Sequence, residues 1–91
     1  MGYWIELGEI ESYISTIPNI TESCVVFGRK NGLEQIVCFL VSSIKKKEIR
    51  DMFKSNLPYY MVPREIIIME SLPKNQNGKI DRRKLSSQYY E

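Results

Sequence analysis

The fold is decided by one stretch of the chain, Cys24-Val25-Val26-Phe27-Gly28-Arg29-Lys30-Asn31-Gly32-Leu33-Glu34-Gln35-Ile36-Val37-Cys38-Phe39-Leu40-Val41. Its two ends, residues 24–27 and 36–41, are apolar runs rich in branched and aromatic side chains, which favour strands. Between them lies Asn31-Gly32, the strongest short signal for a hairpin turn. Both runs are apolar at successive positions, so we expect other elements to cover both faces of the hairpin. The stretch therefore predicts a buried β-hairpin at the centre of the domain.

Apolar residues recur at helical spacing on either side of this hairpin. The set before it is Leu7, Ile10, Ile14 and Ile17. The set after it is Ile49, Met52, Phe53 and Leu57. The first set predicts a helix over about 6–17, because Pro18 pushes the preceding residue out of the helical region. The second set predicts a helix that ends at Leu57, because Pro58 cannot continue it.

The last third of the chain changes character after one more apolar run. Tyr59–Pro63 predicts an extended connector, and Ile66–Met69 predicts a third strand. Pro73–Lys79 is polar and rich in turn-forming residues, which predicts a loop. Asp81 then stands where it would cap a short terminal helix.

These elements define an α+β domain in the order helix, strand, strand, helix, strand, polar loop and short helix. No internal repeat or linker interrupts them, so we expect residues 1–91 to form one domain. A hairpin followed by a helical crossover is expected to place the third strand beside the first, antiparallel to it and parallel to the second. The prediction is a three-stranded sheet of order 2-1-3 with helices packed on it.

Composition and charge exclude several classes of protein. The 91 residues include 13 basic and 11 acidic side chains, a formal net charge of +2, and 43% hydrophobic residues. This composition is typical of a globular domain, and the charge is too small to indicate nucleic-acid binding. No apolar run approaches the roughly 20 residues that span a bilayer, and the first residues lack the pattern of a secretory signal. We therefore expect a cytoplasmic domain that binds neither membranes nor nucleic acid.

The chain contains no histidine and no Cys-x-x-Cys motif. Without them we expect neither a zinc site nor Ser-His or Cys-His catalysis. Cys24 and Cys38 stand inside the apolar runs, where cysteine behaves as a small hydrophobic residue. A disulfide between them is an alternative if the two strands are neighbours. We therefore expect no metal site in this chain.

The polar loop holds the first candidate for chemistry, Gly78-Lys79. Glycine adopts positive φ freely, so Asn77-Gly78 predicts a tight turn that presents the next side chain outward. Lysine there is a point charge on a long stem that would reach a phosphate or a carboxylate. The pattern is not a P-loop, because Pro73 and Ile80 stand where that motif requires glycine and Ser or Thr. An ordinary solvated lysine in a turn is the alternative.

The second candidate is the start of the first helix, Gly2-Tyr3-Trp4-Ile5-Glu6-Leu7-Gly8-Glu9-Ile10-Glu11. Glycine inside a helix costs about 1 kcal/mol relative to alanine, so Gly8 indicates close packing or a bend in the chain. A third cluster, Tyr59, Tyr60 and Arg64, is interpreted as packing.

Together these stretches resemble one known family. Three segments carry the resemblance, in the family's own order: Ile5–Glu11, Leu57–Pro63 and Pro73–Arg83. Over essentially its whole length, the chain is similar to the small C-terminal subdomain of adenylate-forming enzymes. Within that group it most resembles amino-acid adenylation domains of nonribosomal peptide synthetases and D-alanine–carrier-protein ligases. Three motifs in the right order are far more specific than any one of them.

The resemblance implies a function shared between two domains. In the family a large N-terminal adenylation domain binds ATP, Mg²⁺ and a carboxylic acid, and the small domain closes over it as a lid. Lys79, after Gly78 on the side of the ATP α-phosphate, would be the catalytic residue. For thioester formation the small domain rotates, and a second face turns toward the phosphopantetheine thiol of an acyl or peptidyl carrier protein. The residues matched to that face are Tyr3, Trp4, Glu6 and Gly8.

Two departures limit what the resemblance implies. Trp4 stands where the family usually has arginine, so any contact made by that arginine is not carried over. The family's ATP site, acid pocket and magnesium ligands belong to the large domain, so we expect no adenylation by these 91 residues alone. This segment therefore does not specify the acid that is activated, or whether a carrier protein or coenzyme A accepts it.

An interaction module is the alternative function. The chain would then keep the lid fold to bind a carrier protein or a separately encoded large domain, and Lys79→Ala would change neither adenylation nor binding. A third hypothesis, weak nucleic-acid binding through Lys45–Lys47 and Arg82–Lys84, predicts a steep dependence of binding on salt.

Overall fold

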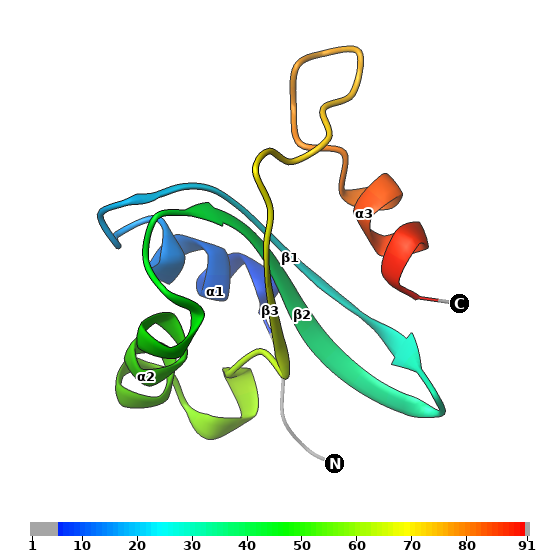
Figure 1. The fold of residues 1–91 in the computed structure, drawn as a ribbon. Helices are drawn as coiled ribbons and strands as arrows, with labels where there is room; N and C mark the ends of the chain where they lie inside the picture. Colours follow the sequence, from blue (N-terminus) through cyan, green and yellow to red (C-terminus); the bar gives the residue numbers. More distant parts are fainter. Residues whose placement is uncertain (1–5, 91) are drawn as a thin grey trace.

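Residues 6–90 are the part of the chain that the computed structural model describes, and they form three helices and three strands (Figure 1). The elements in chain order are α1 (Leu7–Ile14), β1 (Ile20–Lys30), β2 (Leu33–Ser42), α2 (Lys46–Asn56), β3 (Glu65–Ile68) and α3 (Arg82–Tyr89). The α+β class and the predicted order of elements are confirmed.

β1 and β2 form the predicted hairpin. They pair antiparallel, with Lys30 opposite Leu33 beside the turn. Asn31 and Gly32 both have positive φ, 54° and 80°. A type I′ turn requires positive φ at both central residues, and its twist matches that of the strands. The turn therefore fixes the register, which decides the face of the sheet to which each side chain points.

The third strand lies beside β2 and not beside β1, so the predicted order 2-1-3 is wrong. β3 pairs with β2 in parallel, from Val37 opposite Glu65 to Leu40 opposite Ile68, and the order is β1-β2-β3. The predicted direction is correct, since β3 runs parallel to the second strand. Parallel strands need a long crossover, and the segment from β2 through α2 to β3 supplies one between direct neighbours.

The outer edge of β1, where order 2-1-3 would place β3, is occupied by side chains. The carboxylate of Glu11, on α1, accepts a hydrogen bond from the Val25 N–H at 2.8 Å. The guanidinium of Arg82, at the start of α3, donates to the Val25 carbonyl. Edge N–H and C=O groups need such partners when they are withdrawn from water. The two side chains therefore fill, at Val25, the place of a neighbouring strand.

The sheet carries an apolar core on each face, as the successive apolar residues predict. Alternate side chains of a strand point to opposite faces, so β1 and β2 contribute to both cores. Helices α1 and α2 cover one face and α3 the other (Figure 1). The first core contains Ile10, Ile14, Ile17, Val25, Ile36, Cys38, Leu40, Ile49, Phe53, Met61 and Ile66. The second core contains Cys24, Val26, Val37, Phe39, Leu72 and Leu85.

The two cysteines are buried in different cores, and both are free thiols, so the disulfide alternative is excluded. Burial raises the pKa of Cys38 to about 12 and also raises the pKa of Cys24. Both side chains therefore stay protonated at neutral pH, as expected of unreactive core cysteines.

Several element boundaries differ from the sequence prediction. The helix predicted to end at Leu57 ends at Asn56, and the strand predicted at Ile66–Met69 spans Glu65–Ile68. α1 ends at Ile14 rather than at residue 17, and the Thr16 hydroxyl donates to the Tyr13 carbonyl at 2.7 Å in the turn that follows. The connector predicted to be extended contains one 3₁₀ turn, Tyr59–Met61, which buries Met61 against the first core. After α1 the hydrogen bond of Thr16 decides the backbone conformation, and in the connector the burial of Met61 decides it. Neither follows from the spacing of apolar residues and prolines on which the prediction was based.

Gly28 generates a prediction about the second face. A Cβ atom at Gly28 would lie 2.7–2.9 Å from ring carbons of Tyr90, whose hydroxyl donates to the Gln35 carbonyl at 2.9 Å. We expect Gly28→Ala to lower the free energy of unfolding by about 1–3 kcal/mol, because the ring cannot yield without losing its hydrogen bond. Urea unfolding of the purified chain measures this.

The control is the same substitution in a Tyr90→Ala background, where the space is open. There Gly28→Ala is expected to cost almost nothing. An equal cost in both backgrounds would contradict the role assigned to the Tyr90 ring.

Candidate functional site

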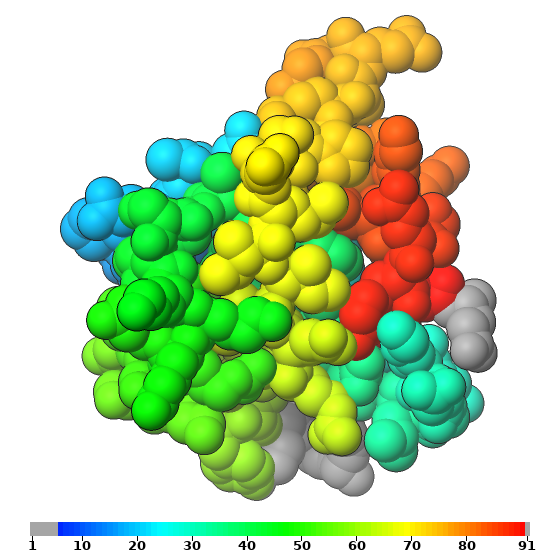
Figure 2. Space-filling view, viewed as in Figure 1, coloured from blue at the N-terminus to red at the C-terminus, as the bar shows by residue number. Residues whose placement is uncertain are grey.

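A small loop between β3 and α3 stands out from the body of the domain (Figures 1 and 2). We call residues 74–80 the Lys79 loop. An antiparallel bridge between Lys74 and Ile80 closes its base. Just below it, the Asp81 N–H donates to the Pro73 carbonyl at 2.8 Å. The loop therefore leaves and rejoins the domain at one narrow neck.

Asn75 holds the inside of the Lys79 loop together. Its side-chain oxygen accepts hydrogen bonds from the N–H groups of Asn77 at 2.9 Å and of Lys79 at 3.1 Å. Its own N–H donates to the Lys79 carbonyl at 2.8 Å, and its carbonyl accepts from the Gly78 N–H at 3.0 Å. These four hydrogen bonds of one residue replace the apolar packing that so short a loop cannot provide.

Gly78 adopts the positive φ that the sequence predicts, 79°. A Cβ atom there would have nothing within 4 Å, so the need for glycine comes from backbone conformation and not from packing. Any other residue would be strained in this region of φ. The turn at Asn77-Gly78 thus sets the direction in which the chain enters Lys79.

Lys79 is exposed, and its backbone is fixed on both sides by Asn75. Within residues 6–90 the structure gives its ammonium group no hydrogen bond or ion pair. The result is a positive charge on a flexible stem that rises from a fixed point. Such a group is suited to bind an oxyanion that another molecule or domain brings to it.

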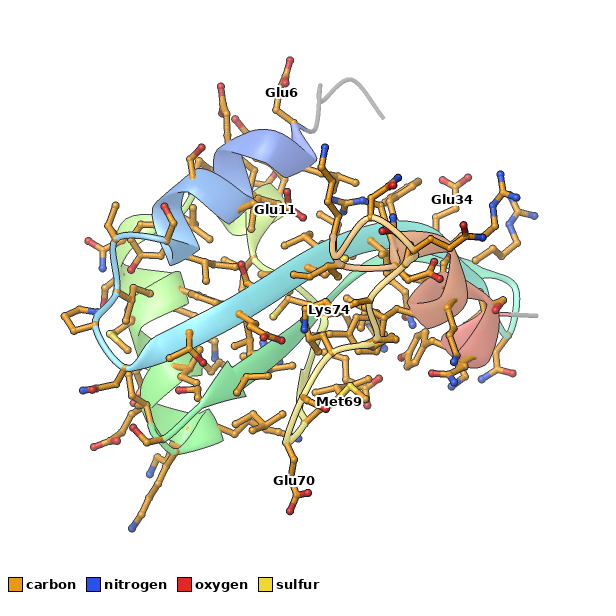
Figure 3. The ribbon with its side chains drawn as sticks, turned by 90° about the horizontal axis from the view of Figure 1, so that it is seen from above. Glu6, Glu11, Glu34, Met69, Glu70 and Lys74 are labelled. Atoms are coloured by element: carbon orange, nitrogen blue, oxygen red, sulfur yellow. The ribbon has the colours of Figure 1, made fainter. Side chains whose placement is uncertain are left out.

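Lys74, at the other end of the loop, has a different role. Its side chain is labelled in Figure 3. Its ammonium contacts the Glu22 carboxylate at 3.0 Å and the Leu72 carbonyl at 3.0 Å. Glu22 also accepts the Leu72 N–H at 3.2 Å. The hydrogen bonds from Lys74 and Leu72 lower the pKa of Glu22, so this carboxylate stays ionised at neutral pH. Lys74 therefore anchors the loop to β1.

The second arm of the loop is anchored at the start of α3. Asp81 caps this helix as predicted, since its side chain accepts the Lys84 N–H at 3.0 Å. Arg82 pairs with Glu11 at 2.9 Å, and its guanidinium also donates to the Val25 carbonyl. Sequence reasoning missed the roles of Glu11, Glu22 and Arg82. The sequence held one signal for these roles: residues 1–23 contain four acidic side chains and no basic one. Glu11 and Glu22 must therefore find basic partners elsewhere in the chain.

The second group of candidate residues lies apart from the loop, at the start of α1. Glu6 and Gly8 are exposed there, and a Cβ atom at Gly8 would have nothing within 4 Å. Close packing at Gly8, one of the two alternatives that the sequence left open, is therefore not found within residues 6–90. Tyr3 and Trp4 lie outside the described residues. The structure thus presents Gly78 with Lys79, and Glu6 with Gly8, on two different elements.

Within residues 6–90 no group of three or more His, Cys, Asp or Glu side chains is arranged to hold a metal ion. None of the helices described is both long and apolar enough to cross a membrane. What the Lys79 loop itself offers is an exposed ammonium group, which is able to contact an oxyanion.

Comparison with known proteins assigns the chain to a family. Residues 9–79 match the family described as the AMP-binding enzyme C-terminal domain, and the chain belongs to it. It is the C-terminal subdomain that adenylate-forming enzymes carry, as the sequence motifs indicate.

The similar curated proteins include two synthases from Brevibacillus. Tyrocidine synthase 3 of Brevibacillus parabrevis is 40% identical over 92% of this chain. Gramicidin S synthase 2 of Brevibacillus brevis is 37% identical over 92% of it. The chain spans only 1% and 2% of the lengths of these two proteins.

Solved structures agree in fold. A four-domain nonribosomal peptide synthetase bound to AMP and glycine superposes with a TM-score of 0.81 and 30% identity, over 90% of this chain and 6% of its own. ATP-bound MatB from Rhodopseudomonas palustris gives a TM-score of 0.87 at 24% identity, over 99% of this chain and 19% of its own. Because the identity to MatB is only 24%, this similarity shows that the two proteins share a fold and nothing more.

The hydrogen bonds of Asn75 predict how the loop responds to its loss. Asn75→Ala removes the acceptor for the Asn77 and Lys79 amides, so we expect their hydrogen exchange to speed up about fivefold, since one hydrogen bond contributes about 1 kcal/mol. Amide exchange followed by NMR on the isolated chain measures this. Asn75→Asp keeps the acceptor and should leave both rates near wild type. Equal acceleration in both variants would show that the side-chain oxygen does not hold the loop.

Proposed function

We propose that this chain is the lid of an amino-acid adenylating enzyme and that Lys79 is its catalytic residue. The observation that carries the proposal is the Lys79 loop, which projects from the domain with its backbone held by Asn75 and its ammonium uncommitted within residues 6–90. A large N-terminal domain would bind ATP and the amino acid. Closure of the lid would then bring Lys79 to the reacting groups.

The chemistry explains why a lysine is needed. One oxygen of the substrate carboxylate attacks the α-phosphorus of ATP, the bond from that phosphorus to the bridging oxygen breaks, and pyrophosphate leaves with the electron pair. The attack brings a carboxylate toward a phosphate that is also negative. An ammonium group between them offsets that repulsion, and its effect is largest where water is excluded. The loop supplies this charge without first breaking an ion pair of its own.

Magnesium and the nucleotide pocket are assigned to the large domain. The described residues offer no carboxylate cluster for a metal ion. Magnesium would neutralise phosphate charge, and this chain would add one ammonium group and the closure that excludes water.

We propose a second face for the transfer step, formed by the segment with Tyr3, Trp4, Glu6 and Gly8. The support is Gly8, whose missing side chain leaves space that nothing in the described part of the domain fills. Glycine weakens the helix there, so its use is explained if a partner approaches the backbone from outside. The partner would be a carrier protein, whose thiol attacks the acyl carbon and releases AMP.

Lys79→Ala tests the adenylation role. In the chain combined with its large domain, we expect amino-acid-dependent ATP–pyrophosphate exchange to fall about 10²–10³-fold, the usual loss when one group that stabilises transition-state charge is removed. Lys47→Ala, which removes another exposed lysine from α2, is the matched control and should leave the exchange rate unchanged.

The same experiment separates the lid from an interaction module. If the chain only binds a partner, Lys79→Ala will leave both exchange and binding of the large domain at wild-type levels, and the lid proposal is then wrong. The purified 91-residue chain alone should show no acyl-adenylate formation.

Gly8→Ala tests the transfer face. We expect this variant to stabilise the isolated chain by up to about 1 kcal/mol, because alanine favours a helix, and yet to slow acyl transfer to the carrier. Ser12→Ala, on an exposed position of α1, is the control and should affect only stability. Thermal unfolding and single-turnover loading of the carrier measure the two effects. Unchanged loading in Gly8→Ala would remove the support for this face.

A further inference from the structure

Both ends of the Lys79 loop are tied to the front half of the chain by an acid–base pair. At the first end Lys74 contacts Glu22 at 3.0 Å, and at the second end Arg82 contacts Glu11 at 2.9 Å. In each pair the carboxylate also accepts a backbone N–H, from Leu72 and Val25 respectively. Each carboxylate is therefore held by two donors.

The Arg82–Glu11 pair does more than join two side chains. Glu11 accepts the N–H of Val25, and Arg82 donates to the carbonyl of the same residue. Together they satisfy both backbone groups of Val25 on the open edge of β1, as a paired strand would. The start of α3 is thus placed against a strand whose own position is fixed by the hairpin and by both cores.

The exposure of the pair indicates what it is for. The side chains of Arg82 and Glu11 are 52% and 25% exposed. Ion pairs with this much contact with water contribute little to the free energy of unfolding. A guanidinium that bonds a carboxylate and a carbonyl together does, however, fix its own position in space. The main consequence of this contact is therefore geometric.

Arg82 follows Lys79 by only three residues, with the neck of the loop between them. The short stretch from Ile80 to Asp81 is closed by the hydrogen bond from the Asp81 N–H to the Pro73 carbonyl. A shift of Arg82 along β1 would therefore be passed through this neck to the direction of the loop. The Lys74–Glu22 pair opposes the same shift from the other arm.

We propose that Glu11 and Arg82 are positioning residues for Lys79, with Glu22 and Lys74 as the second support. This inference rests on the proposed function. Neither Glu11 nor Arg82 touches the substrates in this account. They act by holding the loop so that the ammonium group of Lys79 reaches the reacting oxygens when the lid closes.

The test compares Arg82→Ala with Lys79→Ala in the chain combined with its large domain. We expect Arg82→Ala to lower kcat of adenylation about 10- to 100-fold with little change in KM for ATP, because misplacing a group by about 1 Å has effects of that size. In a Lys79→Ala background, Arg82→Ala should then change kcat by no more than about twofold, since its effect passes through Lys79. Arg29→Ala is the matched control, because Arg29 pairs with Glu34 at 3.4 Å on the hairpin, away from the loop.

Glu11→Gln keeps the proposal testable if Arg82→Ala folds poorly. Glutamine can still accept the Val25 N–H but no longer attracts Arg82, so we expect an intermediate loss of kcat. Hydrogen exchange of the Val25 amide in the isolated chain should stay near wild type in this variant, which shows that β1 is intact.

Three outcomes separate the claims. If Lys79→Ala lowers the exchange rate but Arg82→Ala and Glu11→Gln do not lower kcat, the positioning role is wrong and the proposed function stands. If Arg82→Ala lowers kcat equally with and without Lys79, its role is structural and the inference is overturned. If Lys79→Ala itself has no effect, the proposed function fails, and the positioning role fails with it.

Discussion

The alternation of side chains along the β1–β2 hairpin is the constraint on which the rest of the structure depends. Successive apolar residues enter two different cores, so the hairpin must be covered on both faces. α1 and α2 together cover one face of the hairpin. The other face requires α3, and Leu85 of α3 is buried there. The position of α3 in turn fixes the end of the Lys79 loop.

The Lys79 loop itself has no core. No side chain from Lys74 to Ile80 is fully buried, and the loop projects from the domain (Figure 2). Its shape comes from polar contacts: the four hydrogen bonds of Asn75 within it and the two acid–base pairs at its ends. A loop of this kind can enter the active site of another domain without exposing apolar surface when it is withdrawn. That property fits a lid that opens and closes.

Local patterns predicted the features that local physics decides. The Asn31-Gly32 turn, the Asp81 cap, the positive φ of Gly78 and the end of α2 just before Pro58 follow from neighbouring residues alone. The strand order does not, because it depends on which edge of the hairpin is free. Glu11 and Arg82 occupy the edge of β1, and residues so far apart in the chain leave no local signal of their contact. Lys79 was found through the motif around it, whereas the residues that support it required the structure.

The described residues form two apolar cores of their own, although the segment they belong to matches only a small part of its relatives. Of the two Brevibacillus synthases described above it spans only 1% and 2%, so the matching segment lies there beside much more chain. A subdomain that changes partners, as the proposed function requires, needs an internal structure that does not depend on any one of them. The two cores and the anchored loop provide it within residues 6–90.

The most direct test of this account is the backbone order of the Lys79 loop in the isolated 91-residue chain, measured by NMR relaxation. The account predicts order parameters for the Asn77, Gly78 and Lys79 amides close to the value of about 0.85 that is typical of rigid backbone, and equal to those of β1 and β2. Values below about 0.6 confined to the loop would show that it is flexible before the lid closes. Lys79 would then not be held in place by Asn75 and the two acid–base pairs, and the central claim would be wrong.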